Sequence, residues 1–362
     1  MRQALDLAAL SVGLSEPNPR VGCVITSPDG ARVLGIGHTQ RAGEPHAEVM
    51  ALRDAAAGGH SVAGATVWVT LEPCSHHGRT PPCCDALVSA RVGKVVASVT
   101  DPNPLVGGKG FERLRAAGIA VETGPGAEES RELNIGFFSR MQRGRPWLRM
   151  KVAASLDGRT ALENGTSQWI TSEAARADGH AWRARAGAVL TGIGTVLEDD
   201  PRLDVRHVPT PRQPVAVVVD SRLETPTGAR MFVDGRPLWI YTATRDAPRA
   251  AELEARGATV IGMPGPGGKV DLAALLQDLA RREINELHVE AGHKLNGSLV
   301  RESLVDEYLV YLAPRLVGAG QPMASFGPLA SLADAVPLAF VSVEQVGPDL
   351  RVVARVTGQE RF

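Results

Sequence analysis

A histidine and two cysteines in the first third of the chain could hold a metal ion. His46 and Glu48 form an H-x-E motif, and Cys74 and Cys83 each follow a proline. One imidazole and two thiolates suit zinc that keeps a fourth position open for water. Glu48 has no need to bind the metal and could take a proton from that water, whose pKa zinc lowers to about 7. The motifs predict a catalytic zinc held by His46, Cys74 and Cys83, with Glu48 as the proton-transfer residue.

The spacing of the two cysteines leaves an alternative open. H-x-E followed by P-C-x-x-C is typical of zinc nucleobase deaminases, but here residues 75–82 separate Cys74 from Cys83. A structural zinc would need a fourth protein ligand, and the candidates are Cys84, His76, His77 and Cys23. Cys84 is poorly placed because adjacent helical residues point about 100° apart. Cys23, on an expected strand, fits a small buried hydrophobe better, so an open site is favoured.

The elements around these motifs can be read from local patterns. Residues 46–57 predict a helix whose first turn carries His46 and Glu48, and residues 65–71 predict a strand that leads to Cys74. Pro81 and Pro82 open a helix at Cys83, where the positive helix end favours a thiolate. Further elements are expected as helices over 1–14, 109–117 and 128–142, a hairpin of 21–26 and 31–39, and strands over 94–99 and 119–123.

The second half also alternates strands with helices, which predicts an α/β fold. The expected strands are 147–156, 188–191, 215–220, 238–242, 259–263, 286–290 and 306–312, and the expected helices are 172–186, 271–282 and 294–303. Two glycine turns follow strands, at 191–196 and 290–298, where a phosphate could bind at a helix start. Residues 143–146 are the best boundary, giving domains 1–144 and 145–362.

Composition narrows the class of protein. The 362 residues suggest two domains. The 39 Lys and Arg residues balance 40 Asp and Glu residues, and aromatic residues are 4% of the chain, so a nucleic-acid partner is not expected. There is no apolar run of about 18 residues, and the N-terminus lacks a basic leader, so neither a membrane span nor a signal peptide is expected. Four cysteines are too few for a disulfide framework, which favours a cytoplasmic protein.

Taken together, these motifs resemble the bifunctional riboflavin-biosynthesis deaminase/reductases over essentially the full chain. The matching segments are 17–22 (PNPRVG), 43–48 (GEPHAE), 70–85 (TLEPCSHHGRTPPCCD), 101–104 (DPNP), 154–160 (ASLDGRT), 167–171 (SQWIT) and 199–201 (DDP). The long loop between the two cysteines is itself typical of that family. The resemblance implies a cytidine-deaminase-like N-terminal domain with one zinc ion and a dihydrofolate-reductase-like C-terminal domain that uses NADPH. It also implies a phosphoribosylamino-diaminopyrimidinone substrate, which is deaminated and then reduced in its ribose.

The resemblance also assigns residues. Zinc falls to His46, Cys74 and Cys83, and the proton shuttle to Glu48. The implied cofactor positions are Ala153, Trp169, Thr195, Asp199, Ser221, Gly292, His293, Lys294, Leu295, Asn296, Gly297 and Ser298. The implied substrate positions are Ser167, Arg183, Leu203, Arg206 and Glu290. Glu16 departs from the family, where a histidine is common, and residues 58–62 form a slightly longer segment.

Some assignments remain open at this point. Lys151 is a further candidate for the reductase site, whereas Asp157 fits a turn. One alternative is a deaminase whose second domain binds a nucleotide without reducing anything. Another is a non-catalytic binding module that zinc stabilises. A homo-oligomer is compatible with a chain of this kind.

Overall fold

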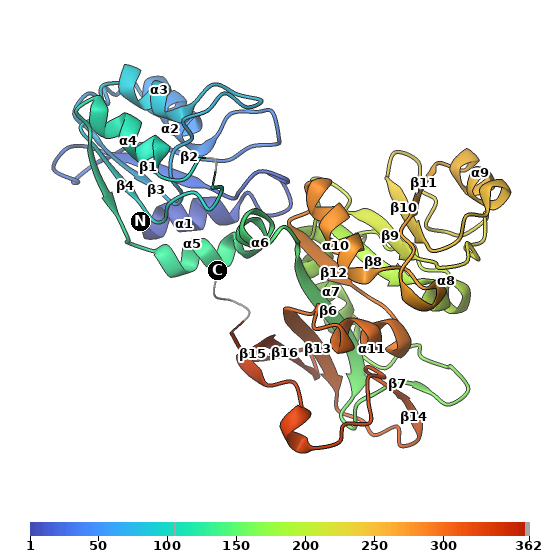
Figure 1. Ribbon diagram of the computed structural model, residues 1–362. Helices are drawn as coiled ribbons and strands as arrows, with labels where there is room; N and C mark the ends of the chain where they lie inside the picture. Colours follow the sequence, from blue (N-terminus) through green and yellow to red (C-terminus); the bar gives the residue numbers. More distant parts are fainter. Residues whose placement is uncertain (105, 359–362) are drawn as a thin grey trace. The chain divides into compact units, whose positions relative to one another are not determined.

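The computed structural model describes residues 1–104 and 106–358. The chain divides into two compact units, Met1–Gly144 and Arg145–Phe362. Each unit is built on its own β-sheet (Figure 1).

The first unit has a five-stranded sheet with helices on both faces, as expected. Its strands are β1 (Gly22–Thr26), β2 (Val33–His38), β3 (Thr66–Val69), β4 (Lys94–Ala97) and β5 (Ala120–Thr123). Its helices are α1 (Arg2–Ala9), α2 (Ala47–Ala57), α3 (Cys83–Ser89), α4 (Lys109–Ala116), α5 (Ala127–Leu133) and α6 (Ile135–Arg143). The order is β2-β1-β3-β4-β5, with β1 antiparallel to both neighbours and β3 to β5 parallel.

Two glycines let helices approach this sheet closely from opposite sides. A Cβ atom on Gly22 of β1 would lie 1.8 Å from the carbonyl oxygen of Ala4 in α1. On Gly37 of β2 it would lie 2.4 Å from the carbonyl oxygen of Ala47 in α2. Any larger residue would therefore push a helix away from the sheet. Close packing on β2 fixes the start of α2, where His46 and Glu48 lie.

Two helices of the first unit differ from expectation. The helix expected over 1–14 ends at Ala9, and the one expected over 128–142 is divided into α5 and α6 at Asn134. Asn134 leaves the helical conformation, with φ −110° and ψ 18°. Its side-chain amide donates to the carbonyl of Arg20 and its side-chain oxygen accepts from the Arg20 N–H. Asn134 therefore ties the entrance of β1 to these helices, a long-range contact that local patterns do not reveal.

The second unit has a nine-stranded sheet and a small two-stranded one. Its strands are β6 (Trp147–Ser155), β7 (Arg159–Leu162), β8 (Ala188–Gly192), β9 (Val215–Val219), β10 (Leu238–Thr242), β11 (Ala258–Gly262), β12 (Glu286–Val289), β13 (Glu307–Ala313), β14 (Gly320–Pro322), β15 (Leu338–Val346) and β16 (Asp349–Val356). Its helices are α7 (Glu173–Arg185), α8 (Ile193–Asp199), α9 (Ala247–Ala255), α10 (Leu272–Arg281) and α11 (His293–Arg301). The main order is β11-β10-β9-β8-β12-β6-β13-β16-β15, and it is parallel from β11 through β13.

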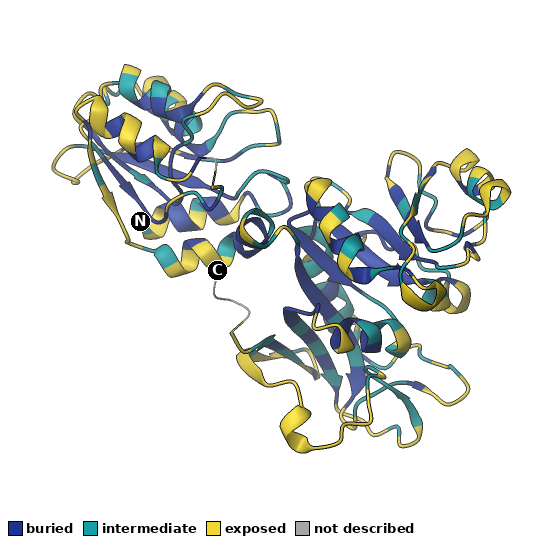
Figure 2. Cartoon of the chain, in the orientation of Figure 1, coloured by how far each residue is buried: buried dark blue, intermediate teal, exposed yellow. Residues whose placement is uncertain are grey.

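Several elements of the second unit were not predicted: β7, α8, α9, β14, β15 and β16. Helix α8 begins directly after Gly192, inside the glycine pattern that was interpreted as a turn. Strand β15 is exposed along almost its whole length (Figure 2), so it lacks the alternation of apolar and polar residues that marks a half-buried strand.

The central strands of the large sheet have one apolar and one charged face. Leu148, Met150 and Val152 of β6 pack in the core with leucines of α10 and α11. Because side chains alternate along a strand, Arg149 and Lys151 point to the other face, where Arg149 stacks on Trp182 of α7 at 4.4 Å. The charged face lies beneath α7 and contributes Lys151 to the cavity of the second unit described below.

Candidate active sites

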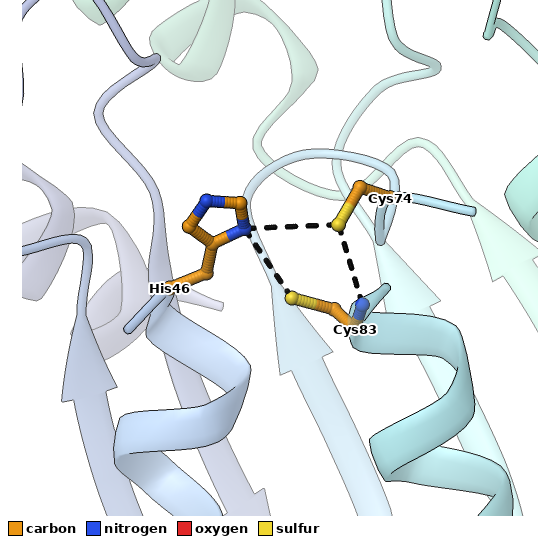
Figure 3. Close-up of side chains that lie close together, drawn as sticks. All are labelled: His46, Cys74 and Cys83. Carbon is orange, nitrogen blue, oxygen red and sulfur yellow. Dashed lines mark hydrogen bonds between the residues drawn. The ribbon is translucent and has the colours of Figure 1, made fainter. Parts of the chain in front are cut away.

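The three proposed zinc ligands lie together in the first unit. The ligand atoms of His46, Cys74 and Cys83 are all within 4.8 Å of one another. His46 Nδ1 is 3.7 Å from Cys74 Sγ and 3.4 Å from Cys83 Sγ (Figure 3). In a tetrahedral zinc site with bonds of about 2.0–2.3 Å, ligand atoms are separated by roughly 3.5–3.8 Å. The donor types and their spacing therefore fit a zinc ion.

Three elements bring these ligands together. His46 is the residue before α2, Cys74 follows β3, and Cys83 is the first residue of α3. On the other side of the imidazole, Thr80 Oγ1 is 3.4 Å from His46 Nε2. Such an outer contact orients a ligating histidine. The position of Thr80 between the two cysteines placed it near the site, but its contact with His46 was not predicted from the sequence.

The other candidate ligands lie elsewhere. Cys84 Sγ donates toward the carbonyl oxygens of Pro73 and Gly110, at 3.2 and 3.5 Å. Cys23 is buried in β1, while His76 and His77 are exposed. Within residues 1–104 and 106–358, the metal-binding group contains three residues and no fourth. This arrangement leaves one coordination position for water.

Glu48 is buried beside the three ligands, with 4% of its surface exposed. Burial, followed by the charge of Cys74, raises the pKa of Glu48 to about 7. Hydrogen bonding from Cys83 lowers the pKa of Cys74 to about 4. A carboxyl group with a pKa near neutrality can both accept and return a proton under working conditions. A metal site with a thiolate ligand beside a carboxyl group of raised pKa suits hydrolysis.

Glu72, two residues before Cys74, is a positioning residue that sequence reasoning missed. Its buried carboxylate accepts hydrogen bonds from four backbone N–H groups, those of Asp101, Gly108, Gly110 and Phe111, at 2.8–3.3 Å. Three of these donors lie at the start of α4, where N–H groups lack helical partners. Glu72 therefore fixes the segments that surround Cys74. No local motif marks this role.

The second unit contains a cavity of about 470 Å³, within the usual range for small-molecule sites. Seven predicted residues line it: Trp169, Arg183, Thr195, Asp199, Leu203, Arg206 and Glu290. Lys151 lines it as well. Lining residues that were not predicted are Gln168, Arg176, Gly179, His180, Asp200, Pro201, Arg202, His207 and Arg230. The excess of cationic side chains suits a phosphorylated ligand.

A buried ion-pair group forms part of the cavity wall. The guanidinium of Arg183 binds both carboxylate oxygens of Glu290, with Nη2 2.9 Å from Oε2. Lys151 Nζ is 3.7 Å from the same Oε2. Despite burial, Arg183 and Lys151 hold the pKa of Glu290 well below its usual range. Glu290 is therefore an ionised anchor for two cations.

Other predicted cofactor residues lie near this cavity without lining it. A Cβ atom on Gly292 would lie 3.8 Å from Thr195 Oγ1, so the two predicted glycine turns adjoin. They follow the neighbouring parallel strands β8 and β12, whose carboxyl ends share one edge of the sheet. A Cβ atom on Gly194 would meet no atom within 4 Å, which leaves room for a ligand against the backbone. These turns fit a nucleotide cofactor.

Several members of the predicted set also make contacts within the protein. Ser221 Oγ accepts from the Val270 N–H, and the Asn296 side chain donates to the Met323 carbonyl. Gly297 packs against the backbone of Ser325, where a Cβ atom would come within 1.9 Å. The remaining predicted positions, Ala153, Ser167, His293, Lys294, Leu295 and Ser298, lie on β6, in the loop before α7 and on α11.

Asp157 occupies a turn. Its carboxylate accepts from Ser155 Oγ and from the backbone N–H groups of Val317 and Gly318. These hydrogen bonds lower its pKa to about 2. The contacts agree with the turn role expected of Asp157, and it does not line the cavity described above.

Comparisons with known proteins match both units. The family described as "Cytidine and deoxycytidylate deaminase zinc-binding region" matches residues 1–99, and "RibD C-terminal domain" matches residues 146–352. Riboflavin biosynthesis protein RibD of Escherichia coli is 44% identical over 97% of this chain and 96% of its own length. The protein of the same name from Aquifex aeolicus is 40% identical over the same shares.

Solved structures extend the likeness to the whole fold. Acinetobacter baumannii RibD, form 1, has a TM-score of 0.90 and 40% identity, covering 98% of this chain and 97% of that one. A Thermotoga maritima protein, described as a diaminohydroxyphosphoribosylaminopyrimidine deaminase and 5-amino-6-(5-phosphoribosylamino)uracil reductase, has a TM-score of 0.85 and 32% identity over the same shares. The fold class and the family predicted from the sequence are confirmed. The chain therefore belongs to the RibD family of riboflavin biosynthesis proteins and is a bifunctional deaminase and reductase.

Proposed function

We propose that the unit Met1–Gly144 deaminates a phosphoribosylamino-diaminopyrimidinone by hydrolysis. The unit Arg145–Phe362 then reduces the ribose of the product to the ribityl chain with NADPH. The observation that carries the first half is the group of His46, Cys74 and Cys83, whose ligand atoms lie within 4.8 Å of one another beside buried Glu48. The name of the Thermotoga maritima relative supports both the substrate class and the order of the two steps.

In the deaminase unit, His46, Cys74 and Cys83 would hold the zinc ion. As a Lewis acid, zinc would lower the pKa of a water molecule enough for its deprotonation near neutral pH. Glu48 accepts that proton and later delivers a proton to the leaving amine, so that water replaces the amine and ammonia departs. A carboxyl group whose burial raises its pKa to about 7 is suited to both transfers. Thr80 keeps the His46 ring in its orientation.

In the reductase unit, the cationic wall of the cavity binds the substrate phosphate through Arg183 and Arg206. Ser167, Leu203 and Glu290 are the other proposed substrate-binding residues. The cofactor is held by Trp169, Thr195, Asp199, Ala153, Ser221 and the segment Gly292–Ser298 at the start of α11. NADPH supplies the hydride. Lys151 and Arg183, aligned by Glu290, place positive charge beside the substrate and restrict its orientation.

Family membership favours this bifunctional scheme over a second domain that only binds a nucleotide, and over a non-catalytic zinc-stabilised module. The deciding experiment supplies the amino-pyrimidine substrate with NADPH and follows ammonia release and NADPH absorbance together. We expect ammonia release first and NADPH oxidation second. Each substrate molecule consumed should release one ammonia and oxidise one NADPH. Ammonia release without NADPH oxidation would support a second domain that only binds a nucleotide. The absence of both ammonia release and NADPH oxidation would support a non-catalytic zinc-stabilised module.

Assembly and location are further parts of the proposal. Strand β15 lies at one edge of the large sheet and exposes Phe340 and Val343, at 77% and 55%. An exposed apolar edge strand is a natural contact for a second copy of the chain. Among the described residues, no helix combines the length and apolarity needed to cross a membrane. The cysteines at the zinc site need a reducing compartment to remain ligands, which supports a cytoplasmic location.

A further inference from the structure

His288 is a fully buried residue beside the reductase cavity whose role is not explained by the fold. It lies in β12 between β6 and β8, in register with Arg149 and Val189, and none of its surface is exposed. Two residues further along, Glu290 continues the pairing through its N–H, which donates to the Leu190 carbonyl at 2.8 Å. Both side chains therefore point to the charged face beneath α7.

The imidazole of His288 is directed at the Glu290 carboxylate. His288 Nε2 is 3.3 Å from Glu290 Oε1. Within the described part of the chain, neither ring nitrogen makes a hydrogen bond of good geometry. Leaving a buried polar group unsatisfied is energetically costly, so such a group in a native core requires an explanation. Hydrogen bonds in active sites are often long or poorly aligned until substrate binds.

The charged groups around the His288 imidazole determine its protonation state. Arg149 of β6 is paired with Glu286 and Glu307, so its charge is already balanced. Burial lowers the pKa of His288; Glu290 opposes this shift, and the guanidinium groups of Arg149 and Arg183 add to it, so that the net shift is downward. The ring is therefore neutral and carries a single N–H. If that proton is on Nε2, it faces Glu290 Oε1, 3.3 Å away.

We propose that His288 is a positioning residue for the reduction, which donates from Nε2 to Glu290 Oε1 and so fixes the carboxylate that aligns Arg183 and Lys151. The inference rests on the proposed function of Glu290 as a substrate-site residue. Oε1 is shared by His288 and Arg183, and Oε2 by Arg183 and Lys151. Without the donor from β12, the carboxylate is held only by Arg183 of α7 and by the longer contact to Lys151 of β6, and it can rotate away from Lys151.

The test compares four variants of the full-length protein: His288→Leu, His288→Gln, Glu290→Gln and the double variant His288→Leu/Glu290→Gln. Reduction is measured as NADPH oxidation with the deaminated intermediate, and ammonia release by the same preparations is the control. We expect His288→Leu to lose about tenfold to a hundredfold in kcat/KM, the range for one hydrogen bond to a charged group. His288→Gln, which keeps an N–H donor, should recover most of this loss.

The double variant separates positioning from a general packing role. If His288 acts through Glu290, the double variant should be no slower than Glu290→Gln alone. Losses that simply add would overturn the proposal, as would parent reduction rates in His288→Leu or a His288→Gln variant as slow as His288→Leu. If His288→Leu does not fold, His288→Asn replaces it, because its shorter amide cannot reach Glu290. Parent rates in Glu290→Gln would instead refute the proposed function of Glu290, and with it this inference.

Discussion

The backbone N–H of Cys83 donates a hydrogen bond to Cys74 Sγ at 3.2 Å. Cys83 is the first residue of α3, so this N–H has no partner inside the helix. Donors at a helix start favour negative charge on sulfur, in agreement with the low pKa of Cys74. Cys83 thus supplies one proposed zinc ligand through its side chain and favours the thiolate form of Cys74 through its backbone N–H.

Replacing Cys83 by alanine should remove zinc and with it deamination. Only His46 and Cys74 would remain as ligands, and two ligands do not hold zinc tightly. Metal content measured by atomic emission should fall from one zinc per chain to near zero. Cys84→Ala is the matched control, because Cys84 Sγ faces the carbonyls of Pro73 and Gly110, and it should retain zinc. A zinc-replete Cys83→Ala protein would contradict the ligand assignment.

Removing zinc with a chelator should abolish deamination and leave reduction intact. Ammonia release should stop, while NADPH oxidation with separately supplied deaminated intermediate should continue, because the proposed metal ligands all lie in the first unit. Adding zinc back should restore ammonia release. A parallel loss of NADPH oxidation would show that the reductase also depends on the metal.

Lys151→Ala should slow reduction by at least tenfold and leave deamination at the parent rate. Lys151 lines the cavity and its ammonium is 3.7 Å from Glu290 Oε2, so the change removes a positioned charge from the substrate wall. Steady-state NADPH oxidation and ammonia release on one preparation test both statements. Unchanged NADPH oxidation would remove Lys151 from the site.

Asp101→Asn should stabilise the first unit at alkaline pH. Burial raises the pKa of Asp101 from 3.8 to about 6. The stability that this group contributes is fully present below its unfolded pKa and is lost as the pH rises through about 6. Asparagine stays neutral, so the variant should melt several degrees higher than the parent at pH 8, and this difference should become small at pH 4 and below. An equal difference at both pH values would show that ionisation of Asp101 is not the cause.

The zinc site could be predicted because its residue types are rare and their local context is strong. His46 and Cys83 begin helices that composition and proline mark, and Cys74 follows a recognisable strand. Glu72 was missed because its four backbone donors come from residues 101–111, far away in the sequence. Asn134 broke an expected helix for a similar reason, through a contact with Arg20.

The reductase site was predictable only in outline. The glycine patterns at 191–196 and 290–298 correctly marked two strand ends, and the structure places both at the carboxyl edge of the parallel sheet. Lining residues such as Arg202 and Arg230 lie in irregular segments, where neither periodicity nor a motif distinguishes them from surface loops. His288 looked like an ordinary strand residue. Its relation to Glu290 follows from the two-residue repeat of a strand, but only the structure shows which face is charged.

Glu48→Gln should separate metal binding from proton transfer. Glu48 lies outside the group of three ligands, so the variant should keep its zinc. A positioned general base contributes about a hundredfold to ten-thousandfold, and Glu48 is proposed to make more than one transfer, so ammonia release should fall toward the upper end of that range. Reduction of the deaminated intermediate, in the other unit, should match the parent. Substantial ammonia release would place the base elsewhere, and loss of zinc would make Glu48 a structural residue of the metal site.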